Sequence, residues 1–316
     1  MLKICVLTVL SLLSAAENCA AASSEGTSGG QFLRVGVSAR AAALGDSGAA
    51  LSGVQGIFYN PAGLTGVSGT ELYFSQVNWI LDASYSNLAF AKPAGDGVYG
   101  AAVSYLSTPP TDKYDKLGNK LSDTYSSADM AVTAGYSRRL GDRTALGVNL
   151  KYISSKLDTE SASAVAADAG IIYAAIPAKL NLGLVVQNAG TKLSYRSSGD
   201  PLPLTVKAGG QYRLNLGNDR NIKKDMTFFA DLNDMKDAGL YGSLGVDFLT
   251  AYAQGGAFSV RAGYRTNGGG TGAGVSAGLG LDMGSYVIDY AYAPMGDLGN
   301  THRFSLTYKF GVKTRS

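Results

Sequence analysis

The side chains that most often carry out chemistry are scarce in this sequence. His302 is the only histidine, so a histidine-rich metal site or a Ser-His-Asp triad has a single residue to build on. Both cysteines, Cys5 and Cys19, lie in an N-terminal stretch that reads as a cleaved signal, which leaves the mature chain without thiol chemistry. The glycine run at residues 268–274 lacks the Gly-Lys-Ser/Thr ending of a phosphate-binding loop. These features predict a protein that is not an enzyme and uses no cofactor or metal.

Charged side chains recur instead at about one per segment, each on the polar side of an alternating pattern. The ten residues that share this position are Asp129, Lys151, Asp168, Lys207, Asp231, Asp247, Arg261, Asp282, Asp289 and Arg303. Two series alternate in sign along neighbouring segments, namely Asp129, Lys151, Asp168 and Asp247, Arg261, Asp282. Opposite charges on adjacent strands contribute about 0.2–1 kcal/mol per pair, whereas unpaired charges simply face water. Both alternatives predict that the face of the strands that carries these charges does not contact lipid.

The elements that position these charges are strands. From about Leu72 onward, apolar and polar residues alternate with a period of two, the signature of a β-strand. About fourteen such runs begin near residues 72, 83, 98, 128, 144, 164, 179, 204, 226, 240, 258, 272, 286 and 303. Most have about 9–12 residues, close to the roughly 9–11 that a tilted strand needs to cross a bilayer. Soluble sandwiches use shorter strands of about 5–6 residues.

The two faces of these strands differ as a membrane barrel requires. In the last run Phe304 and Leu306 share one face, and Arg303 and Ser305 share the other. A soluble barrel would show the same alternation with its apolar face inside. Strand length, tyrosines near strand ends and a glycine-rich polar face (42 of 316 residues are Gly, against a usual share of roughly 7%) favour lipid outside. The predicted fold class is all-β: a transmembrane antiparallel β-barrel of about fourteen strands, closed because lipid satisfies no free sheet edge.

Long and short connections alternate between the strands. The long set comprises residues 107–127, 155–163, 189–203 and 294–301, and the short set comprises residues 93–96, 140–142, 177–178 and 283–285. Residues 215–225 form a long connection on the short side. Outer-membrane barrels have long extracellular loops and short periplasmic turns. The pattern therefore predicts which end of the barrel faces outward.

The first 22 residues form a predicted signal peptide. Lys3 precedes an uncharged run over residues 4–16, too short for the roughly 20 residues of a membrane-spanning helix. Small residues up to Ala22 complete the pattern of a cleavage site. Lipidation of Cys19 is the alternative, which the polar residues before it disfavour. The predicted domains are therefore residues 1–22 (signal), 23–70 (leader and plug) and 71–316 (transmembrane barrel).

Residues 32–64 lack the strand period and are rich in small residues, which predicts compact structure within the barrel. A periplasmic tail lying against the barrel is the alternative. Arg34 and Arg40 need an acidic or carbonyl partner if protein encloses them, because an unpaired buried charge is unfavourable. We therefore expect them to pair with carboxylates of the lumen and to hold this plug in place.

A turn motif ends the predicted plug. It consists of Asn60, Pro61, Ala62 and Gly63. Proline restricts the residue before it to extended backbone, and glycine is free to adopt a positive φ. These four residues therefore predict a rigid turn that returns the chain to the wall near Leu72.

Several motifs resemble those of the PorV/PorQ family, within the wider group of FadL-like outer-membrane barrels. They are GGQFLR at residues 29–34, ARAAALG at 39–45, YNPAGL at 59–64, DYAYAP at 289–294 and GDLGNTHRFSL at 296–306. The resemblance covers essentially the whole mature chain, and one departure is Leu44, where the family pattern has Met. FadL-like proteins have fourteen strands and an N-terminal hatch, so the resemblance implies the same fold and makes the plug residues the candidate gate.

The resemblance implies two different functions. FadL-like relatives pass hydrophobic molecules through the outer membrane, whereas PorV-like members serve the type IX secretion system and handle exported protein cargo at the cell surface. A mainly structural surface barrel is a third alternative. The expected location is the outer membrane of a Gram-negative bacterium, with outer-membrane lipid and either hydrophobic small molecules or secreted cargo as partners. The small, scattered net charge of +3 argues against a nucleic-acid partner.

Overall fold

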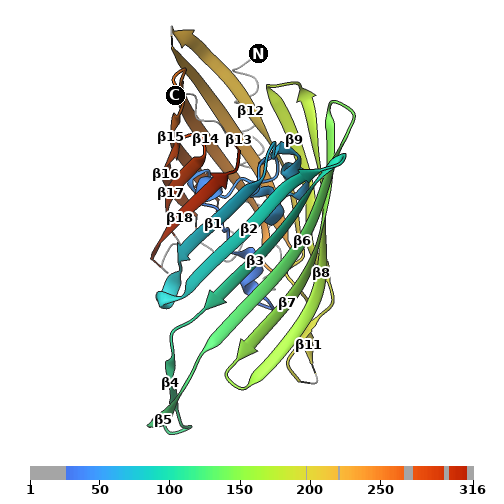
Figure 1. Cartoon of the computed structure of the whole chain (residues 1–316). Helices are drawn as coiled ribbons and strands as arrows, with labels where there is room; N and C mark the ends of the chain where they lie inside the picture. Colours follow the sequence, from blue (N-terminus) through green and yellow to red (C-terminus); the bar gives the residue numbers. More distant parts are fainter. Residues whose placement is uncertain (1–25, 197, 220, 267–272, 295–298, 312–316) are drawn as a thin grey trace.

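The computed structural model describes residues 26–196, 198–219, 221–266, 273–294 and 299–311. The predicted signal peptide, both cysteines, most of the glycine run and residues 295–298 lie outside the described residues. Within them, fourteen strands close on themselves into one antiparallel barrel (Figure 1). This confirms the predicted fold class.

The strands of the barrel follow one another around the wall almost in chain order. They are β1 (Glu71–Asn78), β2 (Ser84–Ala94), β3 (Gly97–Ser107), β6 (Ser127–Leu140), β7 (Thr144–Leu157), β8 (Glu160–Ile176), β9 (Leu180–Gly190), β12 (Thr205–Asp219), β13 (Ile222–Met235), β14 (Gly239–Tyr252), β15 (Ala257–Arg265), β16 (Gly274–Asp282), β17 (Tyr286–Pro294) and β18 (Asn300–Lys309). A short 3₁₀ turn, η3 (Ile80–Asp82), links β1 to β2. The first and last strands close the ring, with Glu71 opposite Lys309.

The alternation of side chains decides which face of the wall meets lipid. On β15 the apolar residues Phe258, Val260 and Tyr264 are exposed, whereas Ser259 and Arg261 are buried. The same alternation of exposed apolar and buried polar residues runs through most of the other strands. A wall that is apolar outside and polar inside is what a bilayer requires of a barrel. None of the helices in the described residues has the length and apolar character needed to cross a membrane.

Two predicted connections are in fact strand. β7 extends to Leu157 and β8 begins at Glu160, so residues 155–163 form a tight hairpin and the prediction of a long loop there was wrong. β12 and β13 similarly extend through most of residues 215–225. In both places small or charged residues hide the alternation of apolar and polar side chains. The strands form nevertheless, because the backbone N–H and C=O groups of a hairpin bond to the adjacent strand whatever the side chains are.

Two long connections carry small sheets of their own. β4 (Thr111–Tyr114) pairs with β5 (Lys120–Tyr125) in a hairpin that extends beyond the barrel rim (Figure 1). Lys113 ties this hairpin to the β7–β8 turn, with its Nζ 2.7 Å from Asp158 Oδ2. β10 (Leu193–Ser194) pairs with β11 (Gly199–Asp200) between β9 and β12. We call the end of the barrel that carries these two hairpins the loop end.

Residues 28–67, here called the N-terminal segment, lie inside the barrel (Figure 1). Their short elements are η1 (Gln31–Arg34), α2 (Ala39–Ala43), α3 (Gly56–Tyr59) and η2 (Pro61–Gly66). The buried apolar core lies between this segment and the wall. In one part of it Phe32 meets Tyr85 of β2 edge to face, with ring centroids 6.3 Å apart. The interior of the barrel is therefore protein rather than an open channel.

Candidate functional site

Glycines of the wall receive the backbone of the N-terminal segment. A Cβ atom on Gly263 of β15 would lie 2.1 Å from the Gly45 nitrogen, and one on Gly183 of β9 would lie 2.0 Å from the Ala49 oxygen. Gly147 and Gly245 would collide with the backbone of the segment in the same way, and Gly170 and Gly278 would collide with the side chains of Asn60 and Ala43. Only a residue without a side chain allows the two backbones to approach so closely. The sequence pattern linked the high glycine content only to a polar face. The structure shows a more specific role, which is to let the N-terminal segment pack closely against the wall.

Asn60 ties the segment to two strands at once. Its side chain is fully buried and donates to the Ala49 oxygen at 2.7 Å within the segment. It also donates to the Ile171 oxygen of β8 at 3.2 Å and to the Leu184 oxygen of β9 at 3.4 Å. Its Oδ1 accepts from the Ala62 nitrogen at 3.1 Å and caps η2, which begins with Pro61. The backbone of Asn60 is extended, with φ −143° and ψ 110°, as the following proline demands.

Gly63 serves a different purpose from the one the sequence indicated. It lies within η2 and is absent from the described residues with positive φ, so the freedom of glycine to adopt a positive φ is not used here. A Cβ atom at Gly63 would instead lie 2.1 Å from the Leu51 oxygen. Close packing of the segment on itself therefore explains this glycine. Pro61 and Ala62 are also fully buried, so the whole predicted turn sits inside the barrel.

Asp231 holds the middle of the segment against β13. Its Oδ2 accepts hydrogen bonds from the backbone nitrogens of Gly48, at 2.6 Å, and Ala49, at 2.8 Å. One residue earlier, Ser47 Oγ is 3.1 Å from Ser243 Oγ of β14, and both side chains are buried. A charged acceptor with two backbone donors is a strong, directional contact. It fixes the segment to the wall without any side chain of the segment taking part.

Tyr59 links three parts of the segment through its hydroxyl. The hydroxyl accepts from the Ser38 nitrogen and donates to Asp46 Oδ1, each at 3.2 Å. Ser38 also donates to Gln55. Burial raises the pKa of Tyr59 well above its usual value, and the nearby Asp46 carboxylate raises it further. The hydroxyl therefore keeps its proton across the physiological range and remains a donor to Asp46.

The two arginines of the segment lie beside carboxylates. Arg34 Nη1 is 3.2 Å from Asp237 Oδ2, which also accepts from Gln31 at 2.8 Å. Arg40 Nη2 is 3.8 Å from Asp247 Oδ2, a looser pair. Asp237 lies in the turn after β13, outside the alternating runs, so the period that selected the other charges passed over it.

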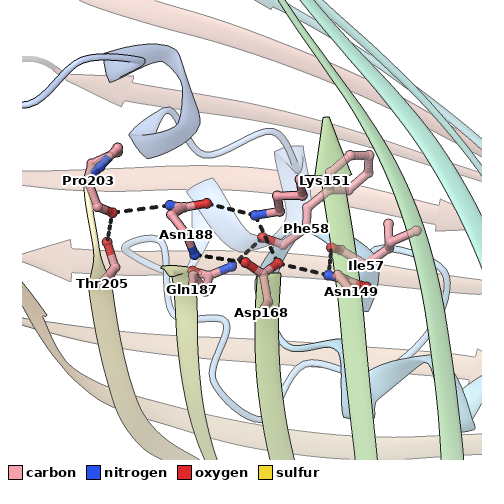
Figure 2. A network of polar contacts seen from close by, with 9 residues as sticks. All are labelled: Ile57, Phe58, Asn149, Lys151, Asp168, Gln187, Asn188, Pro203 and Thr205. Atoms are coloured by element: carbon pink, nitrogen blue, oxygen red, sulfur yellow. Dashed lines mark hydrogen bonds and ion pairs between the residues drawn. The ribbon is translucent and has the colours of Figure 1, made fainter. Parts of the chain in front are cut away.

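A network of polar contacts, shown in Figure 2, joins strands β7, β8 and β9 to α3. Asp168 of β8 is 2.8 Å from Lys151 Nζ of β7 and accepts from Asn149 at 2.9 Å. Its other oxygen accepts from the Asn188 backbone nitrogen, at a point where the β8–β9 register shifts. Asn149 also donates to the Ile57 oxygen of the segment at 2.9 Å. A side-chain carboxylate thus fills the gap that the bulge leaves in the backbone ladder.

A separate network of charged side chains is centred on Arg261 of β15. Its Nε is 3.2 Å from Asp247 of β14, and its Nη1 is 2.6 Å from Asp289 of β17. Gly280 of the intervening β16 stands opposite Asp289, and a Cβ there would lie 2.5 Å from the guanidinium. The arginine therefore reaches across a whole strand through a glycine. The sequence series pointed to Asp282 as its partner, but Asp282 pairs with Lys309 at 2.9 Å.

The remaining predicted charges have separate surroundings. Asp129 accepts from Ser155, and not from Lys151 as its series suggested. Arg303 donates to the Gly36 oxygen at 2.7 Å and lies over the Trp79 ring at 5.9 Å. Among the described residues no group of three or more His, Cys, Asp or Glu side chains is placed to hold a metal ion.

A cavity remains between the segment and the wall. Its volume is about 50 Å³, and its lining includes Arg34, Phe58 and Tyr59 of the segment and Lys151 and Lys207 of the wall. A dry cavity that admits benzene measures about 150 Å³. This cavity is therefore too small for a monoaromatic molecule.

The wall glycines lead to a sharp prediction. Gly183→Ala is expected to lower the free energy of unfolding by about 1–3 kcal/mol, because the added methyl meets backbone that side-chain rotation cannot relieve. Gly100→Ala is the matched control, since its tight contacts are with the far ends of the Ile57 and Leu64 side chains, at 3.1 and 3.2 Å, and the Phe90 oxygen at 3.5 Å is at ordinary van der Waals distance. That change is expected to stay under about 1 kcal/mol. Urea unfolding followed by Trp79 fluorescence measures both, and equal effects would contradict the close fit.

Comparisons with known proteins show the fold but not a family. No family model and no curated protein matches the sequence. The toluene transporter TbuX of Ralstonia pickettii matches with a TM-score of 0.57 and 14% identity, over 88% of this chain and 100% of that chain. The CymD monoaromatic hydrocarbon channel gives 0.57 and 14%, over 87% and 98%. The toluene transporter TodX of Pseudomonas putida gives 0.54 and 13%, over 86% and 96%. The chain thus has the fold of these hydrocarbon transporters along most of its length.

Proposed function

We propose that this protein is an outer-membrane barrel that passes small hydrophobic molecules, with the N-terminal segment as its plug. The proposal is supported by the apolar outer wall and by the fold that the chain shares with hydrocarbon transporters. Export by a cleaved signal peptide over residues 1–22 is part of the same proposal. Its lipid-facing side would contact outer-membrane lipid directly.

The observation that carries the proposal is the closed lumen. The segment contacts strands on opposite sides of the barrel and leaves a cavity of about 50 Å³, so no hydrocarbon passes while it stays in place. Passage therefore requires the segment to leave part of the wall. The residues proposed for this gate are Arg34, Arg40, Asn60, Pro61, Ala62 and Gly63, because they anchor or shape the segment.

A reversible cross-link tests whether the segment must move. Ser47 and Ser243 have their Oγ atoms 3.1 Å apart, so cysteines at both positions are within reach of a disulfide, whose S–S bond is about 2.0 Å. Oxidised Ser47→Cys/Ser243→Cys protein is expected to lose uptake of radiolabelled toluene by cells that carry it in their outer membrane. Reduction is expected to restore the uptake.

The single variants Ser47→Cys and Ser243→Cys, treated in the same way, are the controls. Wild-type uptake by the oxidised double variant would show that the segment does not open at β14. Toluene entry no faster than in cells without the barrel would refute passage itself, whatever the state of the cross-link.

A second candidate function is a PorV-like accessory of type IX secretion, which the sequence motifs imply. The specific observation in its favour is the β4–β5 hairpin, which extends from the loop end and exposes Tyr114 and Leu117. Exposed apolar side chains on a projecting hairpin are suited to a protein partner. Deleting residues 111–125 would abolish retention of secreted cargo but leave toluene uptake unchanged if this function holds. A barrel that supports neither activity would be a structural surface protein.

A further inference from the structure

The cavity beside the N-terminal segment has room for a few atoms only. A water molecule needs about 10–15 Å³ of such space, so a volume of about 50 Å³ admits roughly three to five atoms other than hydrogen. Its lining is chemically mixed, with Phe58 and Met235 beside the polar groups of Thr205 and Gln187. The cavity is thus the size of a small polyatomic ion and not of a hydrocarbon.

Lys207 lines this cavity with an ammonium group that has no hydrogen-bond acceptor in the described chain. It is 6% exposed, and within the described residues it has no hydrogen bond and no carboxylate within 4 Å. Its ammonium lies over the Tyr59 ring, whose centroid is 5.5 Å from Nζ. Asp231, on the neighbouring strand, interacts with this charge at longer range, while its Oδ2 accepts hydrogen bonds from the backbone of Gly48 and Ala49. A buried ammonium without a hydrogen-bond acceptor is unfavourable, so the site lacks an acceptor at Lys207 Nζ.

Arg34 supplies a second set of free donors to the same cavity. Its Nη1 is used by Gln31 and Asp237, but its Nε and Nη2 are buried and have no partner in the described chain. Lys151, by contrast, is satisfied by Asp168 and Asn188 (Figure 2).

The lining also holds one carboxylate, Asp46, which has other partners. It accepts the hydroxyl of Tyr59. A Cβ on Gly36 would meet both Asp46 and Arg303, at 2.2 and 2.8 Å, so these two charges face each other around that glycine. Asp46 is thus placed as the counter-ion of Arg303, and Lys207 Nζ remains without a hydrogen-bond acceptor.

We propose that the cavity binds one small oxyanion, a carboxylate or phosphate of four or five heavy atoms, between Lys207 and Arg34. The ammonium would supply charge, and the free guanidinium nitrogens would supply the directed hydrogen bonds that oxyanions prefer. Because Lys207 belongs to the wall and Arg34 to the segment, the ion joins the two. This site is separate from the proposed passage of hydrocarbons and does not depend on it.

Calorimetric titration of the purified full-length barrel tests the site. The probes are sodium acetate and sodium phosphate, in a buffer whose other anion is the bulky sulfonate of HEPES. At least one probe is expected to bind, and the stronger of the two identifies the class of ion. Lys207→Met is expected to weaken that binding at least tenfold, whereas Lys192→Met, in an exposed loop, is expected to leave it unchanged. Benzoate is expected not to bind, because it has nine heavy atoms.

Three results would overturn the proposal: no binding of either probe, equal binding by Lys207→Met, or binding of benzoate as tight as that of acetate. A second measurement covers the case in which Lys207→Met does not fold. In wild-type protein with ¹⁵N-labelled lysine, the probe is expected to shift one Nζ resonance. Lys207→Arg, which keeps the charge, is expected to remove that resonance. A shift that persists in Lys207→Arg would place the ion elsewhere.

Discussion

Deleting residues 32–64 is expected to raise the single-channel conductance of the refolded barrel several-fold. Eight strands enclose a space that side chains alone can fill, and the diameter of a barrel grows with strand number. Fourteen strands leave a wider lumen, which here is filled by the N-terminal segment. Water and ions replace the segment when it is removed. Planar-bilayer recordings measure the change.

The matched control deletes residues 111–125, the hairpin outside the barrel, and is expected to leave the resting conductance unchanged. A shift in gel mobility between boiled and unboiled samples verifies that each variant forms a barrel, because a closed backbone ladder resists detergent until it is heated. If a folded barrel without residues 32–64 conducted like the wild type, the plug hypothesis would be contradicted. The alternative, a tail that lies against the outside of the barrel, would then be favoured.

Replacing Arg261 by leucine is expected to lower the free energy of unfolding by about 3–5 kcal/mol, the usual effect of removing one member of a buried ion pair. Asp247 and Asp289 would lose the guanidinium that both contact, and both are buried. Urea unfolding in lipid vesicles measures the loss. Arg196→Leu is the control, because its pair with Glu160 is mostly exposed and such pairs contribute at most about 1 kcal/mol.

A combined variant separates charge from packing at this site. Arg261→Leu with Asp247→Asn and Asp289→Asn removes the unpaired charges together with their partner. We expect it to recover part of the lost stability, since neutral amides are less costly to bury than carboxylates. If Arg261→Leu were no more harmful than Arg196→Leu, the inward position of this network would be wrong.

The wall of the barrel was predictable because its physics is local. A period of two is imposed by the strand itself, so Phe258 and Arg261 could be assigned to opposite faces before any fold was known. The strand starts near residues 144, 258 and 286 were also predictable, since turn-forming residues interrupt the alternation just before them. Hairpin ends were not, as residues 155–163 show, because small polar side chains carry little period.

The partners of each charge were not predictable, because they depend on register and on what stands between strands. Arg261 reaches Asp289 only because Gly280 carries no side chain, and no pattern within one strand reveals that. Asp237 and Asp46 were missed for another reason: both lie outside the alternating runs and matter only through the fold. Gly63 shows the same limit, since a glycine required by close approach looks the same in sequence as one required by its φ.

The contacts of the N-terminal segment also constrain the order in which the protein can assemble. Gly36 bonds to Arg303, 267 residues later, and Gly45 bonds to Ser276, 231 residues later. The part of the chain that is synthesised first therefore has to wait for the part that is synthesised last. Because contacts between distant residues slow folding, the emerging chain depends on being kept soluble until β15 to β18 arrive and the ring closes around its own beginning.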